Sequence, residues 1–267
     1  RVRDRQNQVI KLSFCELLRC VAKILRFIFK KKFPLNSLSI LDCIFLNTMK
    51  NCFSLFFFSA ALLAVGQEIP IPSNFSVVAS VYGDLDKDGV DELVVAYNCD
   101  KKNQDEESVP RELIIYKKKN KDWIICEQSK NVLLGSKDGG MMGDPFESIL
   151  IKNGVLSISH YGGSRWKWGY TEKYRFQNKA FYLIGYSSMS GAPCEYWLNS
   201  DFNLSTGKII FTKEYEDCTH SEQEIYKTEN ETFYKKGIKI TLQNRNTNEI
   251  KIVSPKYKHQ LYLSYYN

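Results

Sequence analysis

The chain has 267 residues and a formal net charge of +7, from 37 Lys and Arg against 30 Asp and Glu. Of these, 11 basic residues but only 3 acidic residues precede Gln67, so the remaining part is close to neutral. That part has no basic stripe to neutralise phosphates, and we therefore expect no nucleic acid among its partners. The roughly 200 residues from Gln67 onward are enough for one domain with its own hydrophobic core.

Residues 1–48 contain no motif that specifies a function. Between Phe14 and Phe33 they mix Leu, Ile and Phe with Lys and Arg, which also suits a basic amphipathic helix on a membrane surface. We interpret residues 1–48 as translated sequence upstream of the true start, or as a non-structural segment. The membrane-surface helix stays open as the alternative.

Residues 49–66 have the features of a secretory signal peptide. Met49 and Lys50 give a basic start, and the apolar centre that follows is too short to span a bilayer comfortably. Ala64 and Gly66 are the small residues expected at the third and first positions before a cleavage site. We predict cleavage after Gly66, an extracytoplasmic (periplasmic or secreted) location, and no stable membrane span in the mature chain.

The loop at residues 84–92 carries the most specific chemistry in the sequence, because its spacing suits a calcium ion. Ca²⁺ takes roughly six to eight oxygen ligands, and a glycine, here Gly89, permits the sharp turn that gathers them. A helix-based calcium site is excluded, since the twelfth loop position holds Val95 instead of glutamate. The expected ligands are the carboxylates of Asp84, Asp86, Asp88 and Glu92 and the backbone carbonyl of Val90.

Strand-like runs flank this loop at residues 76–82 and 93–97, which gives the order strand, calcium loop, strand. The sequence 83–95 resembles the FG-GAP/VCBS-type calcium loop of integrin-like β-propeller blades and of many secreted bacterial proteins. The resemblance covers one loop and its flanking strands. It implies the same ligand positions, with Glu92 where the family usually has Asp. The sequence contains no second copy of the loop, so a complete propeller does not follow from it.

The rest of the sequence predicts an all-β domain over residues 67–267. Asn153-Gly154 indicates a two-residue hairpin turn, which pairs Ile149 with Ile158, and a second hairpin turns at residues 178–179. No helical period competes with these patterns, so we expect an antiparallel meander, either a propeller-like fragment or a curled open sheet. Further strand-like runs lie at 113–117, 123–127, 195–199, 208–213, 224–228, 238–242, 250–253 and 261–265.

Four of the 8 cysteines follow Gln67. The turn near residue 206 lies midway between Cys194 and Cys218, so we predict that these two form a disulfide, as an exported chain permits. Cys99 and Cys126 flank the strand-like run 113–117 at a distance that is too long for a disulfide unless the loop after Cys99 folds over. Whether they pair stays open.

Two groups of residues offer alternative functions. The hairpin register places Glu147 opposite His160, and a carboxylate that holds an imidazole could serve as general acid or base in an extracytoplasmic hydrolase. Trp166 and Trp168 could stack on sugar rings in a carbohydrate-binding module, although an aromatic stripe is more often core. We favour an exported, non-catalytic, calcium-stabilised β-protein with a binding or structural role, whose partner is a protein or glycan ligand of unknown identity.

Overall fold

A computed structural model describes residues 69–99, 108–120, 122–219, 224–245, 247 and 250–263. Residues Ile69–Asn267 form one compact unit. The predicted upstream segment 1–48 and signal peptide 49–66 lie outside the described residues. Among the described residues, no helix is long and apolar enough to cross a membrane.

The first sheet is an antiparallel meander of four strands in the order β1-β2-β3-β4. Its two central strands begin with six consecutive buried residues each, because both of their faces are covered. One face packs into the main core cluster, and the other holds a small cluster around Tyr97 and Tyr116. The strands are β1 (Ser76–Gly83), β2 (Glu92–Asn98), β3 (Arg111–Lys119) and β4 (Asp122–Ser129).

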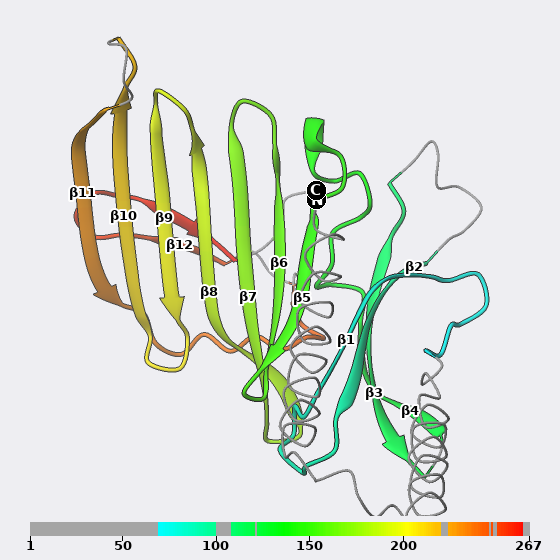
Figure 1. Cartoon of the computed structure of the whole chain (residues 1–267). Helices are drawn as coiled ribbons and strands as arrows, with labels where there is room; N and C mark the ends of the chain where they lie inside the picture. Colours follow the sequence, from blue (N-terminus) through cyan, green and yellow to red (C-terminus); the bar gives the residue numbers. More distant parts are fainter. Residues whose placement is uncertain are drawn as a thin grey trace, which may run out of the picture. The chain divides into compact units, whose positions relative to one another are not determined.

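The second sheet has seven strands, each paired with its neighbours in sequence, from β5 at one edge to β11 at the other (Figure 1). A 3₁₀ turn, η1 (Gly140–Met142), precedes it. Both sheets are antiparallel and open, which confirms the predicted all-β meander. The strands are β5 (Phe146–Lys152), β6 (Val155–Gly163), β7 (Lys167–Gln177), β8 (Ala180–Ala192), β9 (Tyr196–Asn203), β10 (Lys208–Asp217) and β11 (Glu224–Tyr234).

The two predicted hairpin turns are confirmed. Asn153 and Gly154 have φ angles of 54° and 72°, and Asn178 and Lys179 have 49° and 64°, as a type I′ turn requires. The registers that follow from these turns are the observed ones up to the first β-bulge in each hairpin, which lies between Phe146 and Ser148 in the first and between Lys173 and Tyr174 in the second. The confirmed cross-strand pairs are Ile149 with Ile158, Ile151 with Leu156, Phe176 with Phe181, and Tyr174 with Leu183.

A short hairpin of β12 (Lys251–Val253) and β13 (Gln260–Tyr262) crosses one face of the seven-stranded sheet (Figure 1). The run 238–242, which we expected to be a strand, forms only an isolated bridge between Thr241 and Tyr182. The reason is that β9 pairs with β8 only from Gly185 onward. Only the few residues of β8 before Gly185, on the edge that β9 does not cover, are therefore left for pairing.

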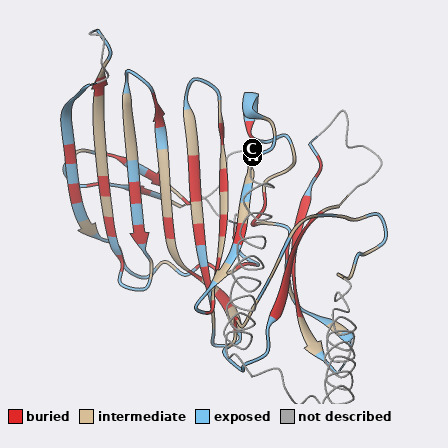
Figure 2. Ribbon diagram, viewed as in Figure 1, coloured by how far each residue is buried: buried red, intermediate tan, exposed pale blue. Residues whose placement is uncertain are grey.

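The main core cluster combines residues of both larger sheets and of the hairpin, and buried residues alternate along the strands of the second sheet (Figure 2). Inside this core, Arg245 pairs with Glu172, and the two side chains are 1% and 0% exposed. The Tyr174 hydroxyl donates a hydrogen bond of 2.9 Å to the same carboxylate. A buried charge is tolerated only when it is paired in this way.

Candidate functional site

The loop between β1 and β2 is a tight turn that its own carboxylates organise. Lys87 and Gly89 have positive φ angles of 65° and 87°, which fold the chain back on itself. Asp84 accepts hydrogen bonds from the backbone N–H groups of Asp88 at 3.1 Å and of Gly89 at 3.0 Å. Asp88 in turn accepts the Val90 N–H at 2.9 Å. The acidic side chains therefore set the loop conformation as well as its charge.

Three of the predicted ligands come together. Asp84, Asp86 and Asp88 each offer a carboxylate oxygen, and these oxygens lie within 4.8 Å of one another. Among the described residues no other set of three acidic, His or Cys side chains is as close. Hard oxygen donors at this spacing are what Ca²⁺ or Mg²⁺ prefers.

The remaining two predicted ligands are placed differently. Val90, whose backbone carbonyl was the predicted ligand, is an exposed loop residue at 45% exposure. Glu92 is the first residue of β2 and is 1% exposed; its Oε2 accepts the Leu85 N–H at 2.8 Å. Its other oxygen, Oε1, is buried and has no hydrogen bond. Burial raises the pKa of the Glu92 carboxyl. This side chain is thus fixed at the base of the loop with one acceptor oxygen still to be satisfied.

Lys117 of β3 is a residue that the sequence reasoning missed. Its ammonium group bonds to the carboxylates of Asp86 and Asp88, the second at 2.6 Å, and lies 3.7 Å from Glu92 Oε1. The hydrogen bond from Lys117 lowers the pKa of Asp88, and the two aspartates raise the pKa of Lys117. A cationic group therefore already stands among the carboxylates, and a bound cation would have to share or displace it.

The register prediction for Glu147 was wrong. A β-bulge between Phe146 and Ser148 makes Phe146, not Glu147, the partner of His160. Glu147 is exposed, whereas His160 is 2% exposed and accepts the Leu134 N–H at 3.3 Å. Both residues border an open depression of about 580 Å³. The imidazole is not held by the carboxylate, because His160 Nδ1 has no hydrogen-bond partner and Nε2 accepts the Leu134 N–H.

His160 is a neutral residue of the interior. Burial and the nearby guanidinium of Arg111 lower the pKa of His160 to about 3. Arg111 itself makes a two-pronged ion pair with Asp144, at 2.7 and 2.6 Å. A general acid or base works best when its pKa is close to the working pH. The surroundings of His160 thus suit packing better than proton transfer.

The two tryptophans lie in different environments. Trp166 precedes β7, is 44% exposed, and contacts Tyr196 edge to face with ring centres 5.3 Å apart. Trp168 is half-buried and packs against the core. Its ring lies nearly parallel to that of Tyr170, at 6.1 Å between centres. The predicted aromatic stripe is therefore mostly core, and Trp166 stands outside it.

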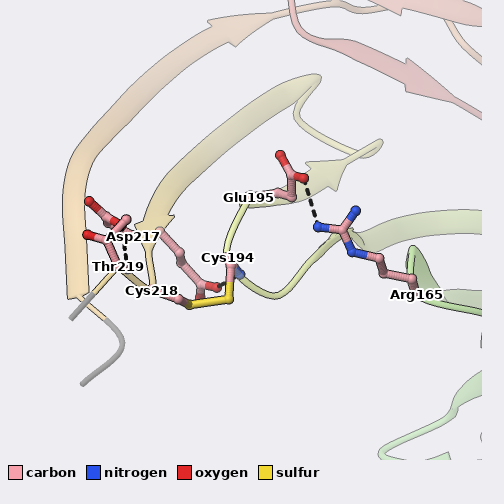
Figure 3. Close-up of a disulfide and its surroundings, with 7 residues drawn as sticks. Arg165, Cys194, Glu195, Asp217, Cys218 and Thr219 are labelled. Carbon is pink, nitrogen blue, oxygen red and sulfur yellow. Dashed lines mark hydrogen bonds and ion pairs between the residues drawn. A yellow bond between two sulfur atoms is a disulfide. The ribbon is translucent and has the colours of Figure 1, made fainter. Parts of the chain in front are cut away.

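The predicted disulfide between Cys194 and Cys218 is present, with a Cα–Cα distance of 5.3 Å (Figure 3). Cys194 follows the end of β8, and its N–H donates to Glu216 at 3.1 Å. Cys99 and Cys126 are both free thiols. Burial is the largest of the effects that raise the pKa of Cys126 to about 11. Its thiol is thus a poor nucleophile near neutral pH.

Comparisons of the sequence with protein-family models, with curated proteins and with solved structures gave no match. Function must therefore be argued from the sites of this chain alone, since an all-β fold hosts many unrelated functions.

Proposed function

We propose that the protein is a non-catalytic, calcium-stabilised β-protein whose loop between β1 and β2 holds one Ca²⁺ ion. The observation that supports this most is the joint placement of three exposed or half-exposed aspartates and the buried Glu92. A glutamate with an oxygen that lacks a hydrogen bond is costly in an interior, and a cation would satisfy it. Asp84, Asp86, Asp88 and Glu92 would be the side-chain ligands, and the Val90 carbonyl the fifth.

A competing interpretation is that Lys117 alone neutralises the loop. Its ammonium group is one positive charge facing the carboxylates of Asp86, Asp88 and Glu92. One lysine therefore leaves excess negative charge at short range, which a divalent ion compensates better. This difference in charge makes the two interpretations separable by experiment.

The test is a thermal melt of the purified protein with chelator, with 1 mM Ca²⁺ and with 1 mM Mg²⁺. If the dissociation constant is near ~10⁻⁴ to 10⁻³ M, as for other extracellular modules, Ca²⁺ adds about 0.4 to 1.4 kcal/mol of stability. For a domain of this size that corresponds to a rise of about 1 to 5 °C in Tm. Mg²⁺ should act weakly, because it requires near-octahedral geometry and loses water reluctantly. Identical melting curves in chelator and in Ca²⁺ would refute the proposal.

The proposal includes export from the cytoplasm. The disulfide supports it weakly, because such bonds persist mainly in oxidising compartments. N-terminal sequencing of protein recovered outside the cytoplasm should begin at Gln67 or within a few residues of it. Recovery of peptides from residues 1–48 in that fraction would contradict the predicted cleavage.

A further inference from the structure

A cavity of about 660 Å³ lies between one face of the seven-stranded sheet and β13. Strands β7 to β10 form one wall, and Gln260–Tyr262 of β13 form part of the other. The volume falls within the roughly 300 to 1,000 Å³ of small-molecule pockets. None of its lining residues belongs to the loop between β1 and β2. The two sites are therefore separate and can be tested separately.

The hollow exists because small residues interrupt a row of large ones. Across the sheet, Ser188 and Ser200 are cross-strand partners, with Tyr170 on one side and Phe211 on the other. The adjacent row on the same face is filled, since Tyr186 pairs there with Phe202. A sheet face shaped only for stability would be packed with large apolar side chains throughout. Serines at both positions leave space and line it with hydroxyl groups.

These hydroxyls can serve a ligand. Ser188 Oγ and Ser200 Oγ lie 2.7 Å apart and share one hydrogen bond. Each hydroxyl can donate one bond and accept two, so the pair keeps capacity for further bonds toward the cavity. Ser190, on the next row, adds a third hydroxyl to the lining. A purely apolar ligand would exclude water and leave this remaining hydrogen-bonding capacity unused, which is unfavourable.

Aromatic rings supply the apolar part of the wall. Trp168, Tyr170 and Tyr186 form a ladder, with centres 6.1 and 5.8 Å apart and interplanar angles of 14° at both contacts. All three side chains border the cavity. An array of packed aromatic rings is rigid, so it contacts a flat ligand face with little loss of side-chain entropy.

The cavity carries almost no charge. Among the described residues that line it, Asp138 is the only charged one, and its carboxylate accepts bonds from Ser108 Oγ at 2.5 Å and from the Gly135 N–H at 2.7 Å. The nearby Lys213 points elsewhere, with its ammonium group 3.7 Å from the ring centre of Tyr196. A phosphate or carboxylate ligand would thus find no cation in the lining, which favours a neutral ligand.

We propose that this cavity binds a neutral saccharide, whose ring face lies against the aromatic ladder and whose hydroxyls bond to the serines. A sugar ring combines an apolar face with several hydroxyls at its edge, which matches both parts of the wall. The proposal deepens the non-catalytic binding role proposed above and names its ligand. It differs from a surface site at Trp166, because Trp166 does not line the cavity.

The test begins with an array of neutral oligosaccharides probed with the purified full chain, followed by calorimetric titration of the strongest hit. Ser188→Leu fills the hollow with an apolar side chain and removes a hydroxyl. We expect it to fold with an unchanged or higher Tm and to weaken binding at least about tenfold, the factor that one lost hydrogen bond can supply. Ser187→Leu is the matched control, because residue 187 lies on the opposite face of β8, and it should bind as the wild type does.

The outcomes separate the possibilities. If no neutral oligosaccharide on the array binds, or if Ser188→Leu binds as tightly as the wild type, the proposal is overturned. If Ser188→Leu fails to fold, Ser190→Leu replaces it under the same criteria. Binding of the neutral apolar dye N-phenyl-1-naphthylamine in place of any sugar would instead assign the cavity to an apolar ligand. Melting curves with and without Ca²⁺ on the same samples show whether the calcium proposal fails independently.

Discussion

Lys117 lies directly across the β2–β3 ladder from Glu92, one position beyond the pair Leu93 and Tyr116. Its ammonium group is 3.7 Å from Glu92 Oε1 and also bonds to two aspartates of the loop. The loop between β1 and β2 therefore carries an internal cation from a third strand. We therefore expect Lys117 to influence how the loop responds to a metal ion.

Replacing this internal cation should make the loop more dependent on calcium. In Lys117→Met, Asp86, Asp88 and Glu92 lose their counter-charge, so we expect a lower Tm in chelator. Ca²⁺ no longer competes with the ammonium group, so the Tm rise on adding Ca²⁺ should exceed that of the wild type. Lys118→Met is the matched control, because the Lys118 ammonium lies over the Trp123 ring, 5.6 Å from its centre. Equal calcium responses of wild type and Lys117→Met would argue against a shared site.

The loop also offers a direct contrast between two aspartates. Asp88→Ala removes a carboxylate of the cluster, and we expect the calcium-dependent rise in Tm to disappear. Asp91→Ala removes one negative charge from an exposed residue that is not part of the cluster, and the rise should persist. Loss of the calcium response in both variants would indicate a general charge effect in place of defined ligands. Differential scanning calorimetry at fixed ionic strength provides the measurement.

Local sequence signals were enough to predict the hairpins and the disulfide. A two-residue turn at Asn153-Gly154 sets the register by itself, so the pair of Ile149 and Ile158 followed from counting along the chain. The same counting placed Cys194 opposite Cys218. Glu147 was misplaced because a β-bulge adds one residue to a strand, and nothing in its neighbouring sequence marks the bulge.

Long-range contacts were not predictable by this route. The connection from β2 to β3 spans residues 99–110, which is too long to give a register by counting, so the approach of Lys117 to Glu92 could not be predicted. The buried pair of Glu172 and Arg245 joins residues 73 positions apart, and Glu172 stands in an aromatic stripe where charge is unexpected. The cavity between the seven-stranded sheet and β13 likewise depends on β13 crossing the sheet, which no local pattern specifies.

The disulfide between Cys194 and Cys218 should stabilise the domain mainly by restricting the unfolded chain. It spans 24 positions, for which the chain-entropy model gives about 3.5 kcal/mol. Replacing both cysteines by serine should therefore lower the unfolding free energy by about that amount in a urea titration, with reductant present in all samples of the variant. Cys99→Ser with Cys126→Ser is the control and should be close to neutral, because neither thiol is bonded to another. An unchanged midpoint for the first variant would show that the bond is dispensable.

Replacing only one residue of the buried ion pair should cost more stability than replacing both. Arg245→Met removes the guanidinium that pairs with the Glu172 carboxylate in the core, and we expect a loss of about 3 to 5 kcal/mol. The double variant Arg245→Met with Glu172→Leu removes both charges and should recover much of this loss, because a paired buried charge and an apolar replacement are often similar in stability. The measurement is a double-mutant cycle in urea. Additive losses in the double variant would argue that the two residues act independently.

Acid should destabilise the domain through His160. Burial and the charge of Arg111 lower its pKa from 6.5 to about 3, so between these values the unfolded chain binds a proton that the folded chain does not. Stability therefore falls as pH decreases from 6.5 toward 3, by about 1.4 kcal/mol for each pH unit well below 6.5. Urea titrations of the wild type at pH 6.5 and 5 should show this loss, and His160→Gln should reduce it.

Carboxyl groups whose pKa is lowered by folding, such as those of Asp144 and Glu231, add to the acid loss nearer pH 4. For the comparison between pH 6.5 and 5, two other groups need controls. Burial also lowers the pKa of His259, so it contributes with the same sign, and His259→Gln isolates that part. Burial raises the pKa of Glu92, so the folded chain holds this proton more tightly than the unfolded chain does. Through Glu92, acid therefore raises the stability of the fold, which is opposite to the effect of His160. A direct readout is the ring proton resonance of His160 in NMR, which should not titrate between pH 7 and about 4 in the folded protein. A titration midpoint near pH 6.5 would show instead that the imidazole is accessible to solvent.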